Sequence, residues 1–176
     1  FNYISALNYN LFKNLEMLKK LDLSHNLIKF LDQEIFYHNF NLEVLNLEYN
    51  KIKFLNKYLF SNLFKLNSIN LMNNSLIRFD TDVINLQNIE KFYLSNNFFQ
   101  KFNFSLIKPQ VLNLSNCSIN HLDLIDLRYL INLTDLDLSY NKIPVDSLNF
   151  IKLNNLKRLI LVQIELNPND SIKLLY

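Results

Sequence analysis

Apolar and polar residues alternate along this chain in a frame that recurs about every two dozen residues. The first full copy begins at Leu18 and reads LKKLDLSHNLI, and the next begins at Leu42 and reads LEVLNLEYNKI. Later copies begin at Leu66, Ile89, Pro109, Leu133 and Leu156, so that successive starts are 24, 24, 23, 20, 24 and 23 residues apart. The frame is LxxLxLxxNxL, and a partial copy precedes it over residues 1–17. We therefore expect one repeat array over residues 1–176 rather than several unlike domains.

The LxL core of each copy predicts a short strand, because alternate side chains of an extended segment point to opposite faces. One such strand cannot bury its apolar face alone, but parallel copies stacked ~4.8 Å apart share an interior. We expect seven strands in one concave sheet, with loops or short helical turns behind them. They should centre on Leu21–Leu23, Leu45–Leu47, Ile69–Leu71, Phe92–Leu94, Leu112–Leu114, Leu136–Leu138 and Leu159–Leu161.

Asparagine recurs at the ninth place of the frame, which we call the ladder position. Such a side chain can bond the backbone groups that a turn leaves unpaired inside the array. The predicted ladder consists of Asn2, Asn26, Asn50, Asn74, Asn97 and Asn141, and it is interrupted by Cys117 and Ile164. On the return path, Phe12, Phe36 and Phe60 recur 24 residues apart, which predicts an aromatic spine in the convex half of the interior.

These features resemble the leucine-rich repeat family over essentially the whole chain. Repeats of about 24 residues with LDLSxNxI and Phe-x-x-Leu-x-x-Leu are similar to those of animal extracellular proteins, such as Toll-like receptor ectodomains and insect immune and adhesion proteins. The resemblance implies an α/β repeat fold, a curved solenoid whose parallel sheet lines the concave side and whose loops and short helices form the convex side. It also implies recognition of a ligand or partner by side chains at the variable positions.

Composition changes the picture mainly by exclusion. The chain contains no Gly, so phosphate-binding Gly loops and the GxSxG nucleophile motif are absent, and Asn is the expected substitute in turns. With one Cys and three His at different repeat phases, we expect no metal site, no cofactor and no catalytic residue. Cys117 is interpreted as a small buried group. A net charge of +2 and a pI near 8.6 favour neither a nucleic-acid partner nor membrane binding.

Most residues expected on the concave face are small and polar, and the exceptions gather on three neighbouring copies. Exposed aromatics among charges are typical of protein interfaces. We therefore expect a protein partner to contact Glu48, Tyr49, Met72, Lys91 and Tyr93, which we call the central patch. Apolar residues at the two ends, among them Ile4 and Ile164, further predict self-association of the chain.

Location is open at this level. Sequons for N-glycosylation occur at Asn73, Asn103, Asn116 and Asn132, among others, and favour an extracellular or cell-surface protein. The lack of a signal peptide and of disulfides favours the alternative, an intracellular repeat scaffold or regulatory domain of a larger protein. The absence of cysteine-stapled caps, which extracellular relatives of this type carry, further predicts that the sequence is a piece of a longer chain.

Overall fold

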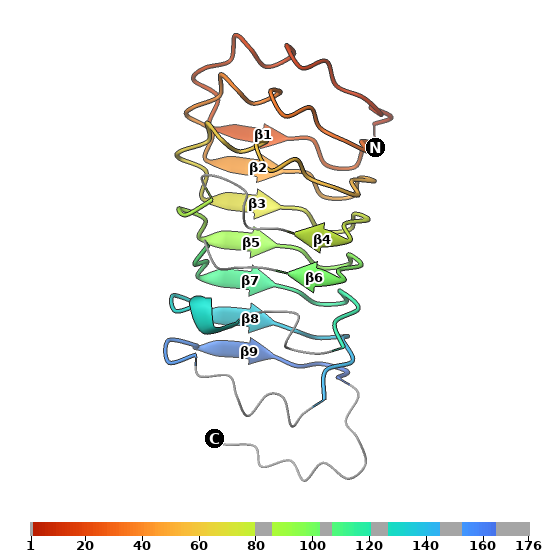
Figure 1. Ribbon diagram of the computed structural model, residues 1–176, viewed down its shortest axis with the longest axis vertical. Coiled ribbons are helices and arrows are strands. Elements are labelled where there is room, and N and C mark those ends of the chain that lie inside the picture. Colours follow the sequence, from red (N-terminus) through yellow and green to blue (C-terminus); the bar gives the residue numbers. More distant parts are fainter. Residues whose placement is uncertain (1, 80–85, 103–106, 121–126, 145–152, 165–176) are drawn as a thin grey trace.

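The computed structural model describes residues 2–79, 86–102, 107–120, 127–144 and 153–164. Within them, seven short strands form one parallel sheet in the order β1-β2-β3-β5-β7-β8-β9, and Figure 1 shows them stacked in a single column. The strands are β1 Lys20–Asp22, β2 Val44–Asn46, β3 Ser68–Asn70, β5 Lys91–Tyr93, β7 Val111–Asn113, β8 Asp135–Asp137 and β9 Arg158–Ile160. The predicted single parallel sheet of stacked repeats is confirmed.

Each strand covers the third to fifth residues of its repeat, so it lies slightly earlier than the sequence predicted. The second leucine of each LxL follows the strand, although its backbone still bonds the neighbouring repeat: the N–H of Leu23 donates to the carbonyl of Asn46 at 2.8 Å. The register pairs equivalent positions, as in Leu21 with Leu45 and Leu45 with Ile69. Side chains at one frame position therefore form rows that run along the solenoid.

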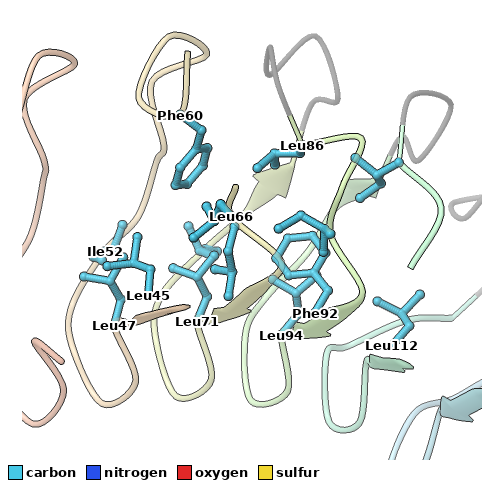
Figure 2. Packing of buried hydrophobic residues seen from close by; sticks show 14 of the residues in the cluster. Leu45, Leu47, Ile52, Phe60, Leu66, Leu71, Leu86, Phe92, Leu94 and Leu112 are labelled. Atoms are coloured by element: carbon cyan, nitrogen blue, oxygen red, sulfur yellow. The ribbon is translucent and has the colours of Figure 1, made fainter. Parts of the chain in front are cut away.

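The core lies between the sheet and the return segments. Leu45, Leu47 and Ile52 of one repeat pack beside their counterparts in the next, and Phe60 enters the same interior from the opposite side (Figure 2). Phe12 and Phe36 are also buried, and their rings stack with centroids 6.0 Å apart. Burial of these three Phe side chains is consistent with the aromatic spine expected from their spacing.

The chain leaves each strand through a left-handed turn at the residue just before the ladder position, which we call the turn position. The residues there have φ between 50° and 59° and include only three Asn: His25, Tyr49, Asn73, Asn96, Asn116, Tyr140 and Gln163. The expectation that Asn replaces Gly in the turns is thus only partly correct. The ladder Asn residues do not have positive φ. Their side chains instead bond the backbone of the turn from inside the array.

The convex side is made largely of turns. It also contains the short helix η2 (Leu127–Tyr129) and two two-residue strands, β4 (Arg78–Phe79) and β6 (Lys101–Phe102), which pair in parallel. In Figure 1 the arrows of β4 and β6 point opposite to those of the main sheet. No helix among the described residues is long and apolar enough to cross a membrane.

Candidate functional site: the concave face

The asparagine ladder fixes the edge from which the concave face is built. Asn50 is buried; its side-chain amide donates to the carbonyls of Leu23 (2.9 Å) and Leu47 (3.0 Å), and its Oδ1 accepts the N–H of Ile28 (3.0 Å). The ladder Asn side chains thus bond their own repeat and the preceding one, and the buried members are Asn26, Asn50, Asn74, Asn97 and Asn141. Asn2 is exposed, and its backbone N–H donates to the carbonyl of His25 at 3.1 Å.

A second hydrogen bond recurs on the concave face itself. At the fifth position of five repeats an Asp or Asn side chain accepts the backbone N–H two residues later, as Asp22 does from Ser24 at 2.8 Å. The other four acceptors are Asn46, Asn70, Asn113 and Asp137. These five side chains are therefore turn-forming groups at the ends of their strands. This Asx bond stabilises the exit from the strand locally.

Tyr93 occupies that fifth position in β5 and cannot make this bond. Its phenol replaces the Asp or Asn side chain that stabilises the turn in five other repeats. Tyr93 is half-buried and lies beside Asn70 and Asn113 in the strand register, between two strands that keep the Asx bond. Since nothing in the core requires an aromatic there, Tyr93 is the clearest departure of the concave face from its structural pattern.

Glu48 and Met72 each lie two residues after the end of a strand, β2 and β3, in the two repeats that precede the repeat of Tyr93. The carboxylate of Glu48 accepts a hydrogen bond from the side-chain amide of Asn70 at 3.0 Å, and Asn70 is the register partner of Tyr93. Met72 is half-buried one repeat later than Glu48. The structure therefore brings Glu48, Met72 and Tyr93 together on three adjacent repeats.

Tyr49 lies after the end of β2 rather than on the strand. It occupies the turn position, with its N–H donated to the carbonyl of Met72 at 3.0 Å and its ring stacked on His25 of the preceding repeat. Its side chain thus belongs to the rim of the concave face. Tyr49 contacts the patch through its backbone, and its ring extends the patch toward the amino-terminal repeats.

Lys91 is the exposed cation of the central patch. It shares β5 with Tyr93, and the buried Phe92 between them places both on the same face. Asp135 and Arg158, in the same row of the sheet, pair with each other at 2.6 Å, and the pKa of Asp135 is lowered by the Thr134 hydroxyl and by Arg158. Lys91 has no ion-pair partner within the part of the chain that the structure describes, so its charge is available to a ligand.

Cys117 is a buried thiol. Its Sγ lies 3.2 Å from the carbonyl of Leu94, and burial raises the pKa of its thiol to about 12. Such a thiol is a poor nucleophile. No group of three or more His, Cys, Asp or Glu residues that could hold a metal occurs among the described residues.

Two models of the leucine-rich repeat family match the sequence, at residues 16–76 and 132–160. The chain belongs to the leucine-rich repeat family. No curated protein sequence matches it. The leucine-rich repeat fold is typically a non-catalytic binding scaffold.

Solved leucine-rich repeat structures superpose on most of the chain. The leucine-rich repeat domain of APL1B has a TM-score of 0.67 and 23% identity, covering 93% of this chain and 62% of its own. Toll of Drosophila, in a glycosylated complex with Spatzle, has a TM-score of 0.74 and 23% identity, and the match covers 92% of this chain and 27% of Toll. TLR13, in complex with ssRNA13, has a TM-score of 0.69 and 27% identity, and the match covers 92% of this chain and 28% of TLR13. The chain thus spans less than two thirds of the length of each of these relatives.

The sequons of this leucine-rich repeat chain differ in their surroundings. Asn132 is exposed, in the loop before β8. Asn116 is exposed at a turn position, but its side-chain amide donates to Asn96 Oδ1 at 2.7 Å. Asn73 is half-buried at a left-handed turn, and Asn103 falls outside the described residues.

A second set of Asn side chains, on the outer side of the repeats, escaped sequence reasoning. Each donates its amide to a backbone carbonyl 24 or 25 residues earlier; the four are Asn41, Asn62, Asn88 and Asn155. Three of them directly precede the first residue of a repeat, so their constant phase was a usable signal. Their bonds tie neighbouring repeats together outside the core.

Proposed function

We propose that this chain is a non-catalytic recognition module that binds a protein partner on its concave face through the central patch. The observation that carries the proposal is Tyr93, an aromatic side chain at the position where five other repeats keep a turn-stabilising Asp or Asn. A residue that lacks the local hydrogen bond and presents a partly exposed ring is better explained by a role in partner binding than by a role in stabilising the fold.

The surroundings of Tyr93 suit a protein ligand. Lys91 provides an exposed cation, Glu48 a carboxylate that accepts a hydrogen bond from Asn70, and Met72 an adaptable apolar side chain. Interfaces combine such an aromatic anchor with charged groups at its border. The solved complex of Toll with Spatzle supports protein binding by this type of scaffold.

The test compares two tyrosines. Partner binding by Tyr93→Ala is measured beside Tyr37→Ala, which removes an exposed ring from a convex turn. We expect Tyr93→Ala to weaken binding by about 1–2 kcal/mol, or roughly 5- to 30-fold in Kd, at an unchanged melting temperature. Equal binding by both variants and the parent protein would place the interface away from the concave sheet.

We further propose that the protein acts outside the cell or at its surface, where Asn132 carries a glycan. It is exposed in a loop, whereas the amide of the other exposed sequon, Asn116, is hydrogen-bonded to Asn96, and the Toll structure is itself of a glycosylated form. Secretion from animal cells should yield a protein whose mobility shifts on glycosidase treatment, with the shift reduced in Asn132→Gln. A protein without glycan after secretion would favour the alternative, an intracellular scaffold or regulatory domain.

A further inference from the structure

A second surface lies on the flank of the solenoid, where each repeat continues past its ladder Asn. Backbone hydrogen bonds join these segments from repeat to repeat, from the N–H of Lys51 to Ile28 and from Ser75 to Ile52. Ile28 and Ile52 are buried, while Lys29, Lys51 and Lys53 beside them are exposed. We call the exposed set the basic flank; it consists of Lys29, Phe30, Lys51, Lys53, Phe54 and Arg78.

Two phenylalanines of the basic flank remain in solvent. Phe30 is 63% exposed and Phe54 is 48% exposed, at equivalent places of adjacent repeats. Both Lys53 Nζ and the guanidinium carbon of Arg78, which comes from the next repeat, lie 5.8 Å from the centroid of the Phe54 ring. These cation–π contacts hold the ring on the surface between two positive charges.

Among the described residues, the six members of the basic flank include four basic side chains and no acidic one. Lys29, Lys51 and Lys53 form no ion pair with any described residue, unlike Lys19, which pairs with Glu43 at 3.3 Å. Asp32 and Glu34 lie at the border near Phe30, around a shallow pocket of about 500 Å³. They do not neutralise the lysines of the next repeat, so the flank presents a local positive potential beside exposed aromatic rings.

We propose that the basic flank docks an extended acidic segment of a partner protein, in which hydrophobic side chains recur among carboxylates. The carboxylates would meet Lys29, Lys51 and Lys53, while the apolar side chains would cover Phe30 and Phe54. Charge complementarity selects an acidic partner. A nucleic acid fits less well, because Lys53 and Arg78 stand over the Phe54 ring where a base would have to stack.

The experiment measures fluorescence anisotropy of a fluorescein-labelled peptide of repeated Glu-Glu-Leu triplets on addition of the whole chain. The double variant Lys51→Glu/Lys53→Glu should weaken binding by about tenfold or more, and added salt should weaken binding to the parent protein. Phe54→Ser should weaken it by about threefold or more. Melting curves of each variant establish that the fold is kept, and Lys51→Arg/Lys53→Arg should retain binding.

Two controls locate the effect. Lys157→Glu changes an exposed lysine beside β9 and should leave peptide binding unchanged, as should Tyr93→Ala on the concave face. Absence of peptide binding by the parent protein would overturn the proposal, as would equal binding by the Lys51→Glu/Lys53→Glu variant. Tighter binding of an oligo-uridylate than of the peptide would also overturn it, in favour of a nucleic-acid site.

Discussion

The imidazole ring of His25 stacks on the phenol ring of Tyr49, with centroids 4.5 Å apart and planes inclined by 17°. Both residues occupy the left-handed turn position of adjacent repeats, with φ of 54° and 51°. Residues with a Cβ are disfavoured in this conformation. The stack offsets part of that cost, because it packs two side chains that the turn forces outward against each other.

Tyr140 occupies the same turn position with φ of 59° and an exposed side chain. Because Gly adopts this conformation without strain, Tyr140→Gly should be stabler than the β-branched variant Tyr140→Val by about 1–2 kcal/mol. Chemical denaturation of the two variants beside the parent protein measures this. If Tyr140→Val were the stabler of the two, the left-handed turn would be refuted.

Asn50 links two repeats through buried hydrogen bonds. Asn50→Ala should lower the free energy of unfolding by about 1–3 kcal/mol, because it leaves the carbonyls of Leu23 and Leu47 without their amide donor. The matched control is Asn88→Ala, whose amide donates to Phe64 at the exposed outer side. Urea titrations should show a clearly smaller loss for the control, and equal losses would contradict the distinct role of the inner ladder.

Cys117 should resist alkylation in the folded protein. Burial raises the pKa of its thiol to about 12, so very little thiolate forms at mildly alkaline pH. Mass spectrometry after exposure to iodoacetamide should detect modification only in denaturant. Rapid alkylation under native conditions would show that the thiol is accessible.

Asp22 should make stability depend on acid. Its pKa is lowered from the ordinary value of 3.8, chiefly by hydrogen bonds from Ser24. A depressed folded-state pKa contributes stability above the unfolded-state value, and this contribution is lost as the pH falls through the folded-state value. Asp22→Asn should therefore lower the melting temperature slightly at neutral pH and not at strongly acid pH. Equal effects of the substitution at both pH values would show that ionisation of the Asp22 carboxyl does not contribute to stability.

The sheet, its register and the buried ladder positions follow from the spacing of Leu and Asn, because each repeat must bury its LxL face against the next. The left-handed residues were not predictable in the same way. Tyr49 and Tyr140 have no intrinsic preference for such a turn, and the neighbouring strand and ladder impose the conformation on them. The strands β4 and β6 were not predicted either, although the pairing of Arg78 with Lys101 joins equivalent places of two repeats.

The sequence predicts some features of the candidate site but not others. Register alone places Lys91 and Tyr93 on one face and beside the repeat of Met72. It does not reveal that Glu48 is bonded to Asn70, since that contact depends on side-chain conformation. Nor does it reveal that Tyr49 lies at a turn, which moves its ring to the rim. The basic flank likewise emerges only when Arg78 is found over the ring of Phe54 from the preceding repeat.

Cys117 replaces an amide, which offers two donors and an acceptor, by a thiol with one weak donor. Asn141 compensates in part, because its Oδ1 accepts the N–H groups of both Cys117 and Ile119 at 3.0 Å. In a linear array, cooperativity is transmitted only between nearest neighbours. The junction at Cys117 therefore has fewer amide hydrogen bonds than the junctions at Asn50, Asn74 and Asn97, and under mechanical tension it should part before them.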